Sequence, residues 1–165
     1  MIACLDVDYR DEHAMAGCVL ATGWDAAAPT DRLVQRVSPI QPYVPGRFFE
    51  RELPCLRAVL ARVDTPLSAV IVDGYVWLDD AGRPGLGGHL WEALGRAVPV
   101  IGVAKTSFRG SAFAEQVLRG RARRPLFVTA AGIEPAEAAA QVRTMHGPHR
   151  MPTLLAEVDR LCRRA

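Results

Sequence analysis

The sequence predicts an α/β protein whose central sheet is mixed rather than all-parallel, and two observations indicate this. The first 37 residues contain three apolar, β-branched stretches separated by polar turns, a pattern typical of an antiparallel meander. From residue 48 onward, segments with helical periodicity alternate with short, continuous apolar runs of the kind that form buried strands. An antiparallel start followed by alternating helix and strand predicts a layered sheet with helices packed against it.

In the N-terminal part the expected strands are residues 1–9, 14–22 and 31–37. Prolines and one glycine then interrupt regular structure: Pro39, Pro42, Pro45 and Gly46. A helix is expected over residues 48–63, where leucines and valines recur at helical spacing, so that one face is buried. The meander therefore leads into a helix that covers the sheet.

The C-terminal part has the alternating pattern. Its expected strands are residues 68–72, 98–103 and 126–129, and its expected helices are 89–95, 135–145 and 152–163. A glycine-rich loop, residues 79–88, lies between the first strand and the first helix. Ribonuclease-H-like domains have this order of elements, and we expect one such domain over residues 1–165. A doubly wound nucleotide-binding fold needs a glycine-rich turn after its first strand, where this chain has the sequence DYRD.

Composition sets limits on localisation and partners. Half of the residues are hydrophobic and 23% are charged, as in an ordinary globular protein, and the net charge of +2 is too small to indicate nucleic-acid binding by itself. The basic cluster Arg119, Arg121, Arg123 and Arg124 is either a solvated surface or a phosphate-binding surface. The four cysteines have no CxxC spacing, no signal peptide is apparent, and no apolar stretch reaches the roughly 18 residues of a membrane span. We expect a cytoplasmic, reduced protein that does not enter a membrane.

Three acidic residues and one lysine are the candidate catalytic groups. Asp6 and Asp73 lie in or at the end of apolar runs, and Glu52 lies in the first turns of the helix expected at 48–63. Burying a carboxylate is costly unless a cation meets it, and divalent ions bridged by carboxylates suit in-line attack on a phosphodiester. Lys105 follows another apolar run and is the only lysine among the twenty basic residues, which indicates a position that requires a compact ammonium group.

Four motifs together resemble the endonuclease V family of nucleic-acid repair nucleases. They are LDVDY near the start, PYVPG with Glu52 nine positions after its tyrosine, IVDG, and IGVAK, and they occur in the family's order and spacing. The similarity extends over about residues 1–150 and is weakest after residue 110. The combination is specific, and the chain is identified as a divergent and short member of the family.

The resemblance implies a metal-dependent endonuclease that uses Mg²⁺ or Mn²⁺ and cleaves a phosphodiester bond 3′ of a deaminated, inosine-type base in DNA or RNA. It implies three metal ligands: Asp6, Glu52 and Asp73. Lys105 would stabilise charge on the scissile phosphate. Four residues match the wedge that separates the strands, with the tyrosine stacking in the gap: Pro42, Tyr43, Val44 and Pro45. Three glycines match those whose backbone approaches the flipped base: Gly46, Gly74 and Gly85.

The chain departs from the family pattern in two motifs that contain histidine. Where the family reads HGxxHP after VDG, this chain has Tyr75 and Asp79, and where it reads VSxGH, this chain has Ile133, which cannot coordinate a metal. Nearby polar residues are candidate replacements: Asp79, Asp80, Glu134, His146 and His149. Asp8 shares a strand face with Asp6 and is either a third ligand or a solvent-facing or turn residue. Two alternatives stay open, a catalytically impaired nucleic-acid-binding derivative and a nuclease with an altered substrate.

Overall fold

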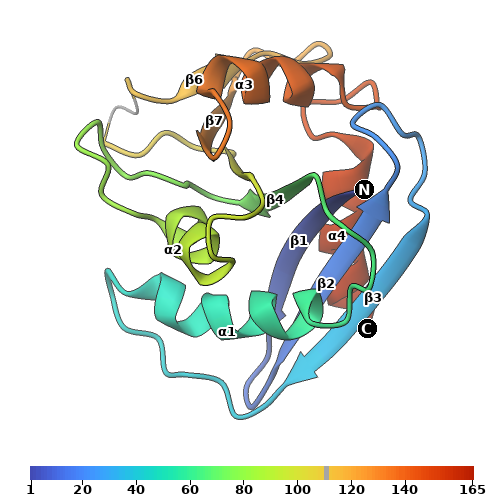
Figure 1. The fold of residues 1–165 in the computed structure, drawn as a ribbon, viewed down its shortest axis with the longest axis vertical. Helices are drawn as coiled ribbons and strands as arrows, with labels where there is room; N and C mark the ends of the chain where they lie inside the picture. The colour runs from blue at the N-terminus through green and yellow to red at the C-terminus, as the bar shows by residue number, and fades with distance from the viewer. Residues whose placement is uncertain (110–111) are drawn as a thin grey trace.

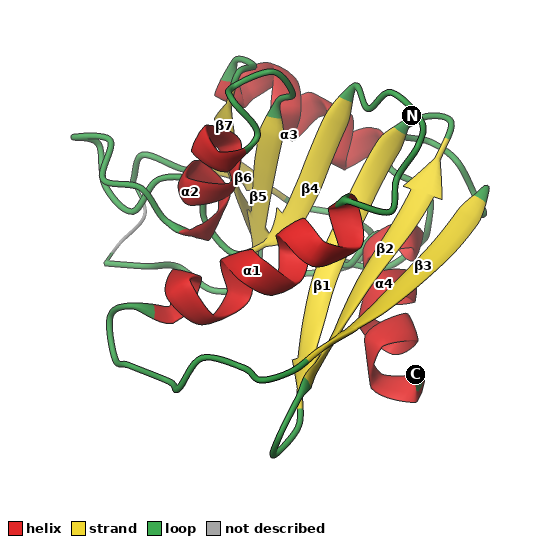
Figure 2. Ribbon diagram, turned by 60° about the horizontal axis from the view of Figure 1, so that its bottom comes forward, coloured by secondary structure: helices red, strands yellow, loops and turns green. Residues whose placement is uncertain are grey.

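The computed structural model describes residues 1–109 and 112–165, and over these residues a seven-stranded sheet is flanked by helices (Figures 1 and 2). The strands are β1 (Ile2–Tyr9), β2 (Ala14–Ala21), β3 (Asp31–Val37), β4 (Ala69–Asp73), β5 (Val100–Ala104), β6 (Glu115–Val117) and β7 (Leu126–Ala131). The helices are α1 (Phe48–Leu60), α2 (Leu86–Ala93), α3 (Pro135–Thr144) and α4 (Thr153–Arg164). No helix in this described part is both long and apolar enough to cross a membrane.

The strand order is β3-β2-β1-β4-β5-β7-β6. The first three strands form an antiparallel meander, β1, β4 and β5 are parallel, and β7 and β6 are antiparallel additions to β5. This arrangement confirms the predicted mixed sheet. Because β7 runs against β5, the carboxyl ends of β1, β4 and β5 and the amino end of β7 lie at one edge of the sheet. We call this the catalytic edge, after the predicted catalytic residues Asp6, Asp73 and Lys105.

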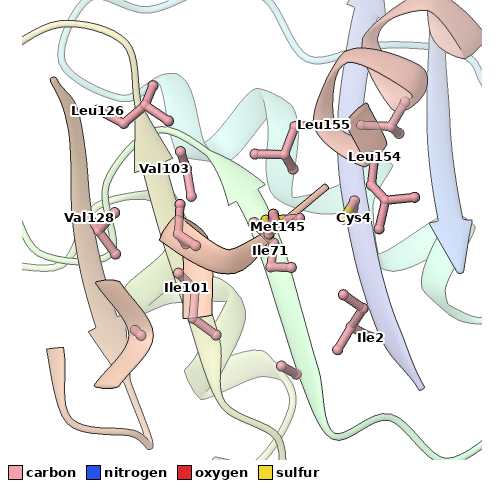
Figure 3. Close-up of a cluster of buried hydrophobic side chains, with 14 of the residues drawn as sticks. Ile2, Cys4, Ile71, Ile101, Val103, Leu126, Val128, Met145, Leu154 and Leu155 are labelled. Atoms are coloured by element: carbon pink, nitrogen blue, oxygen red, sulfur yellow. The ribbon is translucent and has the colours of Figure 1, made fainter. Parts of the chain in front are cut away.

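Side-chain alternation along the strands divides the core into two layers. Cys4, Ile71 and Ile101 face α3 and α4, and this cluster is shown in Figure 3. On the other face, Leu5 and Val72 contact the layer formed by α1 and α2. All four cysteines are buried and none forms a disulfide. Helices on both faces therefore hold the central strands rigidly, together with the residues at the catalytic edge.

Three elements differ most from the sequence-based expectations. Helix α2 begins at Leu86 rather than residue 89, and its Gly87 and Gly88 allow close packing, since a Cβ atom on either would lie 2.7 Å from an atom of Val76. Helix α1 ends at Leu60, three residues early. Strand β6 was not predicted, because it has only three residues and two of them are exposed and polar.

Candidate active site

Parallel pairing of β1 and β4 brings two of the predicted carboxylates together. The register aligns Leu5 with Val72, so Asp6 and Asp73 are the next residues on neighbouring strands. Both aspartates line one cavity at the catalytic edge, and α4 forms another wall of this cavity. Two residues that are 67 positions apart in sequence thus become neighbours through strand register.

Lys105 lies immediately after β5 and lines the same cavity. Its Nζ donates a hydrogen bond to Oδ2 of Asp73 at 2.9 Å. Burial tends to lower the pKa of the Lys105 ammonium, but the hydrogen bond and charge of Asp73, with smaller contributions from Asp6 and Asp159, raise it above its ordinary value. The single lysine of the chain is therefore charged and directed at a catalytic-edge carboxylate.

Glu52 is in the first turns of α1 and is only 6% exposed. Its carboxylate makes no hydrogen bond with the residues that the structure describes. Burial raises the pKa of Glu52 to about 8, and the negative charges of Asp6 and Asp73 add to this effect. Burial likewise raises the pKa of Asp6 to about 6, with further contributions from Asp73 and Asp159. These carboxyl groups lie in an environment that favours an additional cation.

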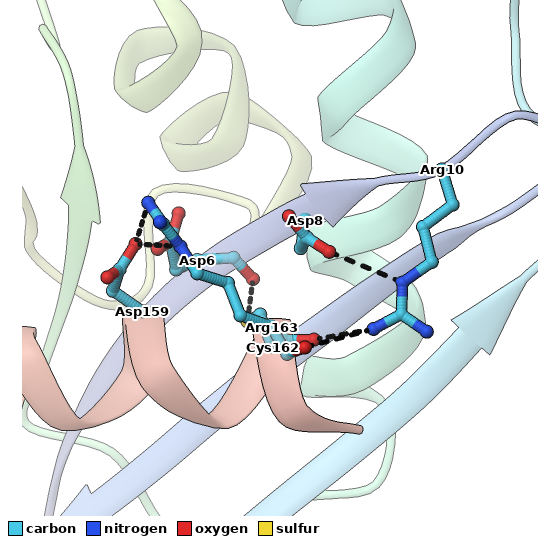
Figure 4. Close-up of polar contacts among 6 residues, drawn as sticks. All are labelled: Asp6, Asp8, Arg10, Asp159, Cys162 and Arg163. Atoms are coloured by element: carbon cyan, nitrogen blue, oxygen red, sulfur yellow. Dashed lines mark hydrogen bonds and ion pairs between the residues drawn. The ribbon is translucent and has the colours of Figure 1, made fainter.

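Asp159 is a fourth acidic residue, and no motif in the sequence indicated it. It lies on α4 and lines the cavity with Asp6 and Asp73, and Figure 4 shows it reaching from the helix toward β1. Arg163, one turn later, forms an ion pair with Asp159, with its Nη2 2.9 Å from Oδ1. Helical spacing places Asp159 on the same face as Leu155 and Cys162, at i, i+4 and i+7, but the spacing does not show that this face packs on β1. In the structure the Cys162 Sγ donates to the backbone oxygen of Asp6 at 3.2 Å.

The donor chemistry of these residues fits a hard divalent ion. Carboxylate oxygens are the preferred ligands of Mg²⁺ and Mn²⁺. Glu52 is buried, makes no hydrogen bond with a described residue and is subject to the negative charge of Asp6, and a divalent ion would stabilise such a carboxylate. In residues 1–109 and 112–165, no group of three or more His, Cys, Asp or Glu side chains is close enough to hold an ion as it stands. A site at this edge therefore depends on two carboxylates and water, which Mg²⁺ accepts, or on rotation of these side chains.

The residues considered as replacements for the missing histidines do not line this cavity. Asp79 accepts the Arg83 backbone N–H at 2.9 Å and pairs with its guanidinium at 3.4 Å. Ile133 packs against the hydrophobic core. The His146 Nδ1 lies 2.9 Å from Thr153 Oγ1. Asp8 lies within β1 rather than in a turn, and it forms an ion pair with Arg10 at 3.3 Å, also visible in Figure 4.

The three predicted base-binding glycines line a second hollow, which adjoins Asp73. A Cβ atom on Gly85 would lie 2.5 Å from the Tyr75 carbonyl oxygen, so only glycine permits this backbone approach. One wall is aromatic, because the Phe49 and His89 rings stack with centroids 3.6 Å apart and planes 12° apart. A concave site with a flat aromatic wall, and with glycine backbone that no side chain covers, suits a planar heterocycle.

The predicted wedge segment lies outside this hollow and is exposed. All four of its residues are on the surface, with Tyr43 58% and Val44 41% exposed. The Tyr43 ring makes an edge contact with Phe48 at 6.5 Å between centroids, and Gly46, just after the segment, lines the hollow. The wedge segment is therefore anchored beside the hollow while its tip is free to contact a ligand.

A mixed sheet of this order, with helices on both faces and acidic residues at the carboxyl edge of its parallel strands, defines a ribonuclease-H-like protein. The family model described as Endonuclease V matches residues 1–133. The chain belongs to the endonuclease V family. An endonuclease V from Streptomyces coelicolor is 36% identical over 98% of this chain and 77% of the relative, and one from Thermococcus kodakarensis is 30% identical over the same shares.

Solved structures agree with this assignment. The endonuclease V of Streptomyces avermitilis superposes with a TM-score of 0.77 at 26% identity, over 99% of this chain and 79% of that chain. A Ciona intestinalis endonuclease V in complex with a 23mer DNA containing an inosine followed by a ribo-adenosine has a TM-score of 0.83 at 18% identity, over 99% and 83%. The resemblance seen in the four motifs and the predicted fold class are both confirmed.

Proposed function

We propose that this protein is a metal-dependent endonuclease that cleaves a phosphodiester bond 3′ of a deaminated, inosine-type base in DNA or RNA. The observation that carries the proposal is the cavity at the catalytic edge, where Asp6, Asp73, Asp159 and Lys105 meet. Membership of the endonuclease V family supports it, as does the inosine-containing DNA bound by the Ciona relative. The adjoining hollow lined by glycines is suited to a base displaced from the stack.

The proposal assigns a role to each residue. Asp6, Glu52 and Asp73 would hold Mg²⁺ or Mn²⁺, which supplies positive charge and an activated water for hydrolysis. Lys105 would place its ammonium beside the scissile phosphate, where negative charge develops as the bond breaks. Its hydrogen bond to Asp73 keeps the ammonium oriented toward the cavity before substrate arrives.

The substrate-binding side of the proposal concerns the hollow and the wedge segment. Tyr43 would occupy the gap left in the base stack, and its exposure makes it available for this contact. The displaced base would lie on the backbone of three glycines: Gly46, Gly74 and Gly85. The stacked pair Phe49 and His89 would cover one of its faces.

The direct test is cleavage of end-labelled strands that carry one inosine, in Mg²⁺ and then in Mn²⁺. We expect a cut 3′ of the inosine. Asp73→Ala should lower the cleavage rate by several orders of magnitude, because it removes both a proposed metal ligand and the hydrogen-bond partner of Lys105. Asp64→Ala, which removes an exposed aspartate after α1, is the matched control and should cleave normally. Cleavage that persists in EDTA would contradict the proposal.

A nuclease with an altered substrate is the second candidate, and the residue that favours it is Tyr75. Tyr75 lines the hollow formed by the three glycines, in place of the family's histidine. Its hydroxyl donates to the Thr106 carbonyl oxygen at 2.7 Å. A panel of inosine, mismatched, branched and RNA strands separates this candidate from the first. Salt-sensitive binding of these strands with no cleavage of any of them would instead identify a binding derivative.

A further inference from the structure

The basic cluster seen in the sequence separates into two groups with different environments. Arg119 is 6% exposed, and its guanidinium donates to the backbone oxygens of four residues in the segment between α3 and α4: Met145, Gly147, His149 and Arg150. Arg121, Arg123 and Arg124 are exposed instead. They make no hydrogen bond or ion pair with any residue that the structure describes. Arg119 is thus structural, and the other three are available to a ligand.

These exposed arginines lie at the catalytic edge. Antiparallel pairing aligns Ala104 of β5 with Phe127 of β7, so the residues before β7 lie beside the end of β5, where Lys105 follows. One nitrogen of Arg150 confirms this proximity, because Nη2 donates to the Pro125 carbonyl oxygen at 2.7 Å and also to the Lys105 carbonyl oxygen. The arginine segment therefore ends next to Lys105.

A fourth arginine joins them from another element. Arg143, exposed in the last turn of α3, lines a surface hollow together with Arg123. The remaining lining residues are Gln116, Leu118 and Pro125, and none of the described residues that line it is acidic. Two unpaired guanidinium groups from different elements on one hollow are suited to a phosphate, which arginine recognises through paired hydrogen bonds.

We propose that Arg121, Arg123, Arg124 and Arg143, here called the arginine surface, bind the backbone phosphates of the nucleic acid on one flank of the cut. The proposal rests on the proposed nuclease function and specifies which surface holds the strand beyond the active site. Strands β7 and β6 lie one and two strand spacings from β5, so the strand ends that flank Arg121, Arg123 and Arg124 lie about 5–10 Å from the end of β5, where Lys105 follows. At roughly 3.4 Å per nucleotide, this distance corresponds to the second or third nucleotide from the scissile phosphate.

The test is equilibrium binding of inosine-containing strands without divalent metal, which prevents cleavage, over a range of salt concentrations. Strands with long flanks are compared with strands trimmed to one nucleotide on the 5′ side or on the 3′ side. For the wild-type protein we expect at least a tenfold weaker Kd when one of the two flanks is trimmed. For Arg121→Gln/Arg123→Gln/Arg124→Gln we expect every strand, trimmed or not, to bind as weakly as the trimmed strand binds the wild-type protein. The slope of log K against log salt should also be smaller in magnitude by about 2–3, since each lost phosphate contact contributes about 0.7–0.9.

The matched control is Arg36→Gln/Arg57→Gln/Arg164→Gln, which removes three exposed arginines located on β3, α1 and the end of α4. It should retain the flank dependence and most of the salt slope, and both triple variants should have the wild-type Tm. Arg143→Gln alone should reduce the magnitude of the salt slope by about 0.7–0.9, which corresponds to one phosphate contact.

A triple variant of the arginine surface that keeps the wild-type flank dependence and salt slope would overturn the inference. Failure of the nuclease proposal gives a different result. In that case the wild-type protein cleaves no inosine strand in Mg²⁺ or Mn²⁺, yet flank-dependent binding is still lost in the surface variant and kept in the control. That pattern would support the arginine surface independently of catalysis.

Discussion

Glu52 and Asp6 give the catalytic edge a charge balance that depends on pH. In the absence of a bound cation, the Glu52 carboxyl group holds its proton until about pH 8, whereas in the unfolded chain it releases it near its ordinary pKa of 4.5. The unfolded state then binds fewer protons than the folded state across this range, so the free energy of unfolding falls as pH rises. We expect the metal-free protein to lose stability between about pH 5 and pH 8, measured by urea denaturation.

Glu52→Gln is the informative variant for this pH effect, because it keeps the shape of the side chain without the ionisable group. Its stability should change much less across the same window, leaving the smaller dependence due to Asp6, whose pKa is about 6. An exposed glutamate variant, Glu12→Gln, should retain the wild-type dependence. Equal slopes for the wild-type protein and Glu52→Gln would contradict this account.

Lys105 lies at the same edge, and its variants distinguish the effect of its charge from the effect of its shape. Lys105→Gln should lower kcat by roughly 10²–10³, the usual cost of removing one group that stabilises transition-state charge. Lys105→Arg keeps the charge but replaces a compact ammonium with a planar, branched group, and we expect it to recover little of this loss. Arg96→Lys, in an exposed pair with Glu92, should leave cleavage unchanged. Full activity in Lys105→Arg would show that charge alone suffices.

Among the elements, β7 positions the turn after Asp73. The Thr129 hydroxyl of β7 accepts a hydrogen bond from the Val76 backbone N–H at 2.8 Å, and both residues are buried. Thr129→Val should leave that N–H unpaired and lower the free energy of unfolding by about 1–3 kcal/mol. Thr129→Ser keeps the hydroxyl and should cost clearly less, mainly through the lost methyl group. Chemical denaturation measures both variants. Equal destabilisation of the two would contradict the predicted role of the Thr129 hydroxyl group.

The segment between α3 and α4 depends in the same way on Arg119. Replacing this arginine with methionine leaves four carbonyl groups without their donor, and we expect a loss of about 2–4 kcal/mol. Arg121→Met, two residues away and exposed, should stay within about 0.5 kcal/mol of the wild-type protein. Thermal and urea unfolding distinguish the two. A neutral Arg119→Met would mean that water replaces the guanidinium contacts.

For the whole molecule, cation binding and folding should be linked. An ion that binds only the folded protein adds about 2.7 kcal/mol of stability at a hundredfold excess over its Kd. We therefore expect Mg²⁺ or Mn²⁺ to raise the Tm at pH 8, where cation binding also relieves repulsion around Glu52. Asp6→Asn/Asp73→Asn should remove this increase, and Asp64→Asn should keep it. An equal Tm increase in the double variant would place ion binding elsewhere.

Local patterns were sufficient for most elements and for part of the site. β-branched runs predicted β1 and β4, and helical spacing predicted α1 with Glu52 in its first turns. Asp159 was missed because its pattern is that of an ordinary helix surface, with Arg163 as an i+4 partner, until α4 packs on the sheet. Strand β6 was missed because pairing with β7, and not its own composition, makes it a strand. The catalytic and metal-binding roles of these residues stay predictions.

The sequence by itself determined the fold class and the family, because alternation of apolar residues and the spacing of four short motifs are local properties of the chain. Only the tertiary structure decided which charges meet. Strand register places Asp6 beside Asp73, helix packing brings Asp159 to them, and antiparallel pairing of β7 brings the exposed arginines to the edge that carries Lys105. Electrostatic interaction depends on distance in space and on burial, and neither can be read from distance along the chain.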